Sequence, residues 1–175
     1  MAEVRRLSAS LEDYLEAIYD IIAEKQAVRA KDLAKRLKVR QASVTGALKT
    51  LAAHGLVNYA PYDVITLTPE GEKIAREVSR RHSILREFLK KVLFVESSEA
   101  DRVACLLEHG VTSEIATKMA LFLEFIEECP LARKKFIEGF KRYLESQGER
   151  RPNCDECLKL VKKIILEHQK DKIAS

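Results

Sequence analysis

The N-terminal third of the chain has apolar residues at helical spacing, interrupted by short polar segments. The first periodic run follows Ser10, a residue suited to cap a helix, and extends over 11–22. Two further runs predict helices over 30–37 and 41–53, joined by a short turn at 38–40. The side chains expected to be buried in these two helices are Leu33, Ala34, Leu37, Val44, Leu48 and Leu51.

Two strand patterns follow the third helix. Gly55 ends that helix, because glycine readily supplies a left-handed residue after the last helical turn. Residues 56–60 and 64–68 predict two strands, and 61–63 between them are typical of a hairpin turn. The order helix, helix, turn, helix and two-stranded wing indicates a winged helix-turn-helix, whose third helix enters the DNA major groove.

The rest of the chain has helical periodicity. Pro69 suits the first turn of a long helix, and Ser98 suits the cap of a later one. The expected helices cover about 69–91, 99–109, 113–127, 131–145 and 154–168. The predicted fold class is therefore mainly α, with an N-terminal winged helix-turn-helix followed by an all-helical region.

The composition agrees with a helical globular chain. Of the 175 residues 33% are charged and 6% aromatic, and six glycines and four prolines are too few for a many-stranded barrel or sandwich. The apolar run 119–125 is interrupted by Glu124 and is too short to span a membrane, and no secretory apolar segment follows Arg5 and Arg6. We expect a cytoplasmic protein without a membrane partner, and the four cysteines do not indicate a disulfide scaffold.

Charge is unevenly distributed, although the formal net charge is only +4. Residues 25–49 carry eight basic side chains and one acidic side chain, a net of +7 that coincides with the predicted helix-turn-helix. A phosphate backbone attracts such a cluster through counterion release, and small polar side chains suit contacts with base edges. The alternatives are a solvated surface or a helix-turn-helix used as a protein interface. The predicted DNA-binding residues are Arg29, Arg40, Gln41, Ser43, Thr45 and Lys49.

Six side chains are candidate metal ligands. Two carboxylates lie three residues apart on the first helix, and a thiol, a carboxylate and an imidazole have the spacing i, i+3, i+4 on a later one. A mixture of oxygen, nitrogen and sulfur donors indicates a transition metal rather than calcium or magnesium. The candidates are Asp13, Glu16, His82, Cys105, Glu108 and His109.

Each candidate also has a structural explanation when it is taken alone. Asp13 and Glu16 suit a solvated helix face, and Cys105 suits a small core position. A second hypothesis is a winged-helix regulator that senses an organic ligand or redox state through the C-x-x-C pair Cys154 and Cys157. An enzyme is not expected, because no Gly-rich phosphate loop or nucleophile elbow accompanies these side chains.

Three separated motifs resemble the DtxR/MntR family of metal-dependent repressors. They are 11–19 in the first helix, Arg81-His82 in the long helix, and 104–109, which is similar to the family's Cys/Glu-x-x-Glu-His ligand motif. The resemblance implies that the six candidates are ligands and that the protein is a homodimer controlling metal-ion homeostasis. It implies a repressor that binds palindromic operators when loaded with Fe(II) or Mn(II), with one or two ions per subunit.

The resemblance also implies a domain organisation. We expect a DNA-binding domain over 1–72, a helical metal-binding and dimerisation domain over 73–130, and a helical extension over 131–175, without the family's SH3-like third domain. Without metal, the clustered carboxylates are expected to repel, and the DNA-binding domains to sample many orientations. Metal is expected to fix the two recognition helices for successive major grooves, about 34 Å apart.

The ligand set combines features of two branches of that family. Asp13 and Glu16 match the manganese-sensing branch, whereas Cys105 matches the iron-sensing branch. The auxiliary site of the iron branch is not expected, because Arg86 and Asp101 occupy the positions of its glutamate and histidine. A thiolate favours iron, cobalt or zinc and carboxylates suit manganese, so we expect Fe(II) first and Mn(II) second.

Overall fold

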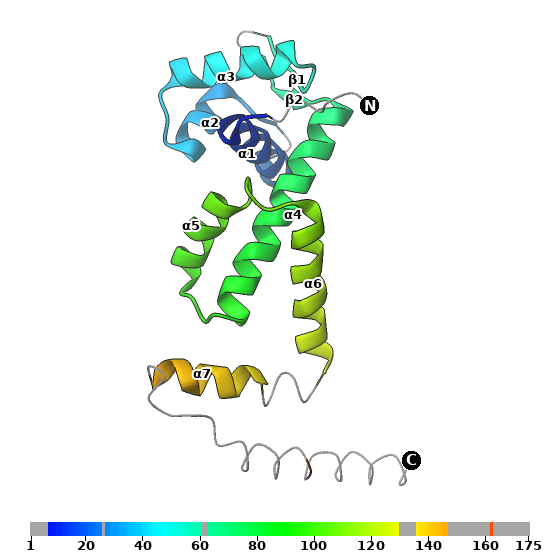
Figure 1. Cartoon of the computed structure of the whole chain (residues 1–175). Coiled ribbons are helices and arrows are strands. Elements are labelled where there is room, and N and C mark those ends of the chain that lie inside the picture. The colour runs from blue at the N-terminus through cyan, green and yellow to red at the C-terminus, as the bar shows by residue number, and fades with distance from the viewer. Residues whose placement is uncertain (1–6, 26, 61–62, 130–135, 147–161, 163–175) are drawn as a thin grey trace. The chain divides into compact units, whose positions relative to one another are not determined.

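The computed structural model of the chain is mostly helical (Figure 1). It describes residues 7–25, 27–60, 63–129, 136–146 and 162. These residues form two compact units. The first combines the residues up to Ser83 with Asp101–Ser113, and the second combines Ile84–Ala100 with those from Glu114 onward. Residues 101–113 therefore belong with the N-terminal part of the chain, and the predicted boundaries after residues 72 and 130 stay predictions.

The first unit begins with three helices, α1 (Ala9–Lys25), α2 (Ala30–Leu37) and α3 (Gln41–Ala53). The bounds of α2 and α3 confirm the prediction. Between them, Lys38 adopts the left-handed conformation with φ 55°, and its backbone N–H donates to the Ala34 carbonyl. This residue ends α2 and directs the chain into α3, so that the two helices form the predicted helix-turn-helix.

The start of α1 differs from the prediction. The Leu11 N–H donates to the Ser8 hydroxyl oxygen at 3.4 Å, and the Leu11 and Glu12 N–H groups also reach the Ser8 carbonyl. The helix is therefore capped by Ser8, and the prediction of Ser10 as the cap is wrong. Both serines have the chemistry of a cap, but only Ser8 lies three residues before an amide that needs an acceptor, and Ser10 is already helical.

One hydrophobic core holds the winged helix-turn-helix together. Its fully buried members include Leu15, Ile18, Val28, Leu33, Val44, Leu48, Leu51 and Ile65. Ala34 and Leu37, which were expected to be buried, are only partly so, because the short helix α2 lies at the edge of this core. The buried side chains come from the apolar face of each helix, which leaves the acidic face of α1 available for other contacts.

The wing consists of β1 (Val57–Asn58) and β2 (Thr66–Leu67), which pair antiparallel with Val57 opposite Leu67. Ile65 also forms an isolated bridge with Val28, which attaches the wing to the segment between α1 and α2. Both strands are shorter than predicted. Few residues of the hairpin are buried, so most of its backbone polar groups can be satisfied by water instead of a ladder.

Helix α4 (Pro69–Lys91) matches the predicted long helix. The Thr68 hydroxyl accepts a hydrogen bond from the Gly71 N–H at 3.1 Å and donates one to the Gly55 carbonyl at 2.7 Å. Gly55 has the expected left-handed backbone, with φ 70°. Thr68 therefore caps α4 and ties its first turn to the end of α3.

Helix α5 (Ser97–Leu107) is shifted toward the N-terminus relative to the prediction of 99–109. The Glu96 carboxylate accepts hydrogen bonds from the Ser98 and Glu99 N–H groups at 2.8 and 3.3 Å, so Glu96 is the cap and the prediction of Ser98 is wrong. The longer acidic side chain of Glu96 thus caps the helix in place of the serine hydroxyl that was expected to do so. Helix α5 ends at Leu107, and the ligand motif continues into the turn that follows.

The second unit contains the end of α4, most of α6 (Ser113–Glu128) and α7 (Glu138–Glu145). One hydrophobic cluster of this unit consists of the buried residues Val92, Ile126 and Ile137. Phenylalanines 88 and 122 pack against this cluster, with 6.0 Å between their ring centroids. The predicted helix 154–168, with its cysteine pair Cys154 and Cys157, lies outside the described residues apart from residue 162. None of the described helices has the length and apolar character needed to cross a membrane.

Candidate metal centre and nucleic-acid interface

A short acidic surface on α1 forms one wall of the candidate metal centre. Glu12 and Asp13 are adjacent and Glu16 follows one turn later, while Leu15 and Ile18 on the other face are buried in the core. The core contacts of α1 therefore fix the rotation of the helix. That rotation points the three carboxylates toward residues 101–113 of the same unit.

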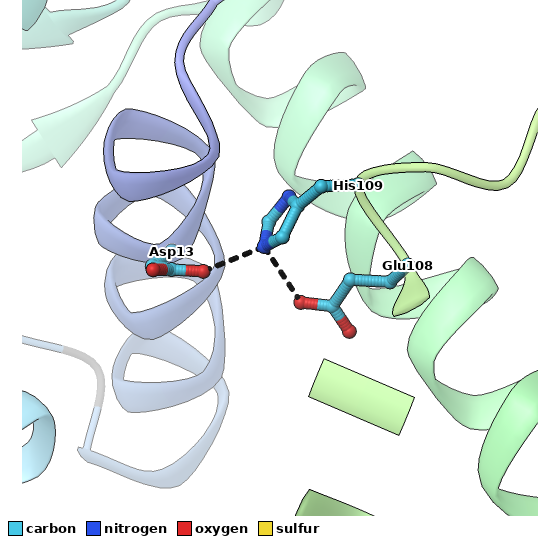
Figure 2. Close-up of side chains that lie close together, drawn as sticks. All are labelled: Asp13, Glu108 and His109. Carbon is cyan, nitrogen blue, oxygen red and sulfur yellow. Dashed lines mark hydrogen bonds and ion pairs between the residues drawn. The ribbon is translucent and has the colours of Figure 1, made fainter. Parts of the chain in front are cut away.

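The first ligand group consists of Asp13, Glu108 and His109 (Figure 2). The His109 Nε2 atom lies 2.8 Å from Asp13 Oδ1 and 3.3 Å from Glu108 Oε1. One donor atom of each of the three residues lies within 4.8 Å of the others. The group joins the first helix of the chain to the turn after α5, 96 residues later.

The second ligand group consists of Glu16, His82 and Glu108. His82, on α4, has its Nδ1 atom 2.6 Å from Glu108 Oε2, and its Nε2 atom lies 3.2 Å from Asp101 Oδ1. Since Glu108 belongs to both groups, each of its two oxygens faces a different histidine. The structure thus brings five of the six sequence-predicted ligands together around one carboxylate.

Glu108 is the least accessible of these carboxylates, with an exposed fraction of 0%. Although α5 ends at Leu107, the Glu108 N–H donates a helical hydrogen bond to the Ala104 carbonyl at 3.0 Å, which fixes Glu108 one turn beyond Ala104. Its Oε1 atom is buried without a hydrogen-bond partner among the described residues. A buried carboxylate oxygen is costly when left without a partner, and a cation is one group that satisfies it.

The electrostatics of the cluster are those of a crowded acidic site. The hydrogen bond to Glu108 raises the pKa of His82 to about 9, against the opposing effect of burial. Burial, followed by the negative charge of Glu108, raises the pKa of Glu16 to about 7. Burial lowers the pKa of His109, but hydrogen bonds to Glu12 and Asp13 outweigh it, and the net shift is upward. Protons thus occupy the positions that cations would compete for.

Cys105 is the sixth predicted ligand, and its sulfur belongs to neither group. It lies one turn before Glu108 and is exposed to solvent. The thiol itself is partly shielded by the protein, and this partial burial, followed by the charge of Glu108, raises the pKa of Cys105 to about 11. The thiol is therefore protonated at neutral pH without a cation, and its role as a ligand stays a prediction.

Three further residues contact the cluster without belonging to either group. Glu12 accepts hydrogen bonds from His109 Nδ1 at 2.8 Å and from Arg81 Nη2 at 3.1 Å, and Asp101 contacts His82. Sequence reasoning did not assign these roles. Glu12 precedes Glu16 by one helical turn, which is the signal that could have placed it on the ligand face.

The donor set fits a divalent transition metal. It offers carboxylates and imidazoles from three segments, which suit Mn(II) and Fe(II), and a buried carboxylate oxygen that lacks a hydrogen-bond partner. The geometry therefore favours metal binding over a solvated acidic face, because a solvated face leaves no such atom buried.

The predicted DNA-binding residues lie at the surface of the winged helix-turn-helix. Arg29, Arg40, Gln41, Ser43 and Lys49 are exposed, and Thr45 is partly buried with its hydroxyl donating to the Gln41 carbonyl at 3.1 Å. A groove of about 450 Å³ runs between α3 and the wing. Its lining includes Arg29, Lys31, Gln41, Thr45, Lys49, Tyr59 and Asp63. Arg40 and Ser43 are outside this lining.

Part of the basic charge of residues 25–49 is paired within the unit. Lys25 lies 3.6 Å from Asp32, and Arg36 forms an ion pair with Glu24 of α1. Asp32 is already counted in the net of +7, whereas Glu24 lies outside 25–49, so the pair with Glu24 lowers the effective charge of this segment by one. Exposed basic side chains remain at the groove.

Two family models match consecutive parts of the chain. Residues 6–65 match the family model of the iron-dependent repressor N-terminal DNA-binding domain, and residues 68–137 match the model of the metal-binding and dimerisation domain of the same family. The chain belongs to the iron-dependent repressor family. Membership confirms the predicted resemblance and the fold class, and the repressor function of the family confirms that the chain is not an enzyme.

Two relatives match this chain over most of their own length. An uncharacterised HTH-type transcriptional regulator of Methanocaldococcus jannaschii is 38% identical over 119 residues, which are 67% of this chain and 95% of that protein. The transcriptional regulator MntR of Escherichia coli is 41% identical over 114 residues, which are 65% of this chain and 73% of that protein.

Two solved repressor structures share the fold. A manganese-dependent transcriptional repressor in complex with manganese has a TM-score of 0.59 and 30% identity, covering 66% of this chain and 53% of that one. The manganese regulator SloR has a TM-score of 0.59 and 28% identity, covering 69% and 56%. The chain spans about half the length of these two solved chains. The two domain types place DNA and a second copy of the chain among its partners.

Proposed function

We propose that this chain is an Fe(II)- or Mn(II)-activated homodimeric repressor that binds palindromic operators and controls metal-ion homeostasis in the cytoplasm. The observation that supports it best is the convergence of two ligand groups on Glu108, a buried carboxylate with an oxygen that lacks a hydrogen-bond partner. The proposed ligands are Asp13, Glu16, His82, Cys105, Glu108 and His109. Because both groups use Glu108, the stoichiometry is one ion, or two that share this carboxylate.

The chain's own residues would couple metal to DNA through α1. Asp13 and Glu16 lie on the helix that packs against α2 and α3, and His109 and Glu108 lie on the segment 101–113. A bound divalent cation would supply the positive charge and the coordination bonds that offset the repulsion of these carboxylates. The acidic face of α1 would then be held to residues 101–113, and the DNA-competent arrangement would become the more populated one.

The proposed DNA contacts divide by chemistry. Arg29, Arg40 and Lys49 suit phosphate oxygens, whereas Gln41, Ser43 and Thr45 at the start of α3 suit base edges. The groove between α3 and the wing supports this division, because its lining contains both kinds of side chain. The contribution of the phosphate contacts is expected to weaken steeply with salt.

We expect Asp13→Ala and His109→Ala to lose metal-activated operator binding while keeping the fold. Each variant removes a member of the first ligand group, so the metal has fewer donors, although both side chains are partly exposed and outside the hydrophobic core. Operator DNA is obtained by in vitro selection with the Mn(II)-loaded protein, and affinity is measured by fluorescence anisotropy with Mn(II) or with chelator.

The matched control is Lys49→Ala, on the DNA-facing side of α3. It should weaken operator binding and lower the salt dependence by about one phosphate contact, with metal affinity unchanged. Full-affinity operator binding by both ligand variants in the presence of chelator would rule out the proposed function.

A second substitution tests metal choice. Cys105→Glu replaces a soft thiol by a hard carboxylate one turn before Glu108, so activation should shift from Fe(II) toward Mn(II), by roughly tenfold in the ratio of activating concentrations. Anaerobic DNA-binding titrations with each metal measure the ratio. Cys105→Ser serves as the control, since it removes the thiol without adding a charge. Identical metal-activation curves for the wild type and both variants would exclude Cys105 as a ligand.

A further inference from the structure

The two histidines of the candidate metal centre share a pattern of contacts, and metal coordination alone does not require it. Each ring has one nitrogen against Glu108 and the other against a carboxylate that belongs to neither ligand group. For His109 the outer carboxylate is Glu12, and for His82 it is Asp101. The two rings use opposite nitrogens for these contacts.

Glu12 is held on both sides. Its Oε2 atom lies 2.8 Å from His109 Nδ1 and 3.1 Å from Arg81 Nη2. The exposed fraction of the Glu12 side chain is 18%, and that of Arg81 is 13%, so the contacts are screened little by solvent. Arg81 thereby holds the Glu12 carboxylate toward the imidazole, because a guanidinium donates in a fixed geometry.

An outer carboxylate that accepts a hydrogen bond from one ring nitrogen leaves the other nitrogen to coordinate a metal. Both nitrogens of each ring face a carboxylate, so the two sides differ only when a cation binds among the ligand carboxylates. An ionised carboxylate only accepts hydrogen bonds, so the nitrogen that stays against the outer carboxylate must then carry the hydrogen. A neutral imidazole has one N–H and one lone pair, which leaves the lone pair on the opposite nitrogen. For His109 that nitrogen is Nε2, 2.8 Å from Asp13, and for His82 it is Nδ1, 2.6 Å from Glu108.

We propose that Glu12 and Asp101 are positioning residues that fix opposite tautomers of the two histidines, so that His109 binds the metal through Nε2 and His82 through Nδ1. The inference rests on the proposed function, since it assumes that both histidines are ligands. Hydrogen bonds from ligand histidines to outer carboxylates orient the ring and raise its basicity. Glu12 is the stronger of the two positioning residues, because the exposed fraction of Asp101 is 62%.

Nitrogen NMR of the full chain labelled with ¹⁵N-histidine tests the tautomers directly. The probe is Zn(II), a diamagnetic ion, and the signals are assigned with His82→Ala and His109→Ala. In the Zn(II)-loaded protein, His109 should show a hydrogen on Nδ1 and His82 a hydrogen on Nε2. Coordination of both rings through the same nitrogen overturns the proposal.

Substitution of Glu12 separates positioning from simple attraction between charges. Glu12→Gln keeps an oxygen that accepts from Nδ1 but removes the charge, whereas Glu12→Ala removes both. The dissociation constant for Mn(II), measured by calorimetry, should rise by about tenfold in Glu12→Gln and further, toward 100-fold, in Glu12→Ala. Equal losses in the two variants overturn the positioning role, because charge alone would then explain them.

The control for charge is Glu24→Gln, which removes an acid from the same helix at the ion pair with Arg36. Its Mn(II) affinity should stay within twofold of the wild type. Asp101→Asn should raise the dissociation constant less than Glu12→Gln does. If the His109→Ala and Asp13→Ala variants lose metal and the Glu12 variants stay within twofold, this inference fails while the proposed function stands. If the ligand variants keep full metal activation, the proposed function itself fails.

Discussion

Replacing Glu108 by glutamine should abolish metal activation more completely than any other single change in the site. Glu108 belongs to both ligand groups, and its two oxygens contact the two histidines. Glutamine has nearly the same volume, so the buried pocket stays filled. The amide has lost the negative charge, however, and its nitrogen is a donor where the metal needs an acceptor.

The expected size of the effect follows from this double role. Loss of an outer partner of a metal ligand typically costs 10- to 100-fold in metal affinity, so loss of a shared ligand should cost about 100-fold or more. At a Mn(II) concentration that saturates the wild type, operator binding should fall to the non-specific level, roughly 10³-fold weaker. Calorimetry for Mn(II) and anisotropy for the selected operator measure the two quantities.

Glu24→Gln is the matched control for Glu108→Gln, because it removes one negative charge from the same compact unit at an exposed position. It should leave both affinities within twofold of the wild type. Circular dichroism checks that Glu108→Gln keeps its helices. A Glu108→Gln protein that is folded and still activated by Mn(II) at the wild-type concentration would exclude a metal centre built on Glu108.

The helices were predictable where local signals agree. Apolar periodicity set the bounds of α2, α3 and α4, since each has a clear polar flank and a residue that ends or begins it, such as Gly55 and Pro69. The caps of α1 and α5 were less predictable, because Ser8 and Ser10 have the same chemistry and Glu96 is not a typical cap. Which of two neighbouring residues caps a helix depends on which side-chain oxygen reaches a backbone N–H group of the first turn.

The candidate metal centre was predictable in its parts and not in its assembly. Spacing identified the donors on each helix, but their convergence depends on residues 101–113 packing with the N-terminal unit, which no local pattern reports. The outer carboxylates Glu12 and Asp101 have the same appearance in sequence as any solvated acid. They become distinguishable only when a histidine nitrogen is found against each of them.

The charge pattern gains a physical meaning from this arrangement. The acids of α1 face the histidines, whereas the basic side chains of α2 and α3 lie at the groove beside the wing. The two charged surfaces share one small core around Leu15 and Leu48. The coupling proposed between metal binding and DNA binding would pass from α1 to α3 through these packed side chains.

Gly71→Ala should be the most destabilising substitution at any glycine that the structure describes. Gly71 lies in the first turn of α4, and a Cβ atom there would stand 1.9 Å from the carbonyl oxygen of Leu56. Leu56 is buried in the core of the first unit, and its carbonyl also accepts the Thr68 N–H at 3.0 Å. The obstacle is backbone, so it cannot rotate away as a side chain would.

Relief of that clash requires α4 to move from the wing, which breaks the Thr68 cap and opens the core beside Leu56. The free energy of unfolding should therefore fall by roughly 3 kcal/mol or more, above the usual cost of overpacking. Urea denaturation of the metal-free protein, followed by circular dichroism, measures this change.

Gly46→Ala is the control, since a Cβ at this position in α3 meets nothing within 4 Å. Alanine should stabilise that helix by about 0.5 to 1 kcal/mol. Equal stability of the two variants would mean that α4 does not approach Leu56 as closely as the structure has it.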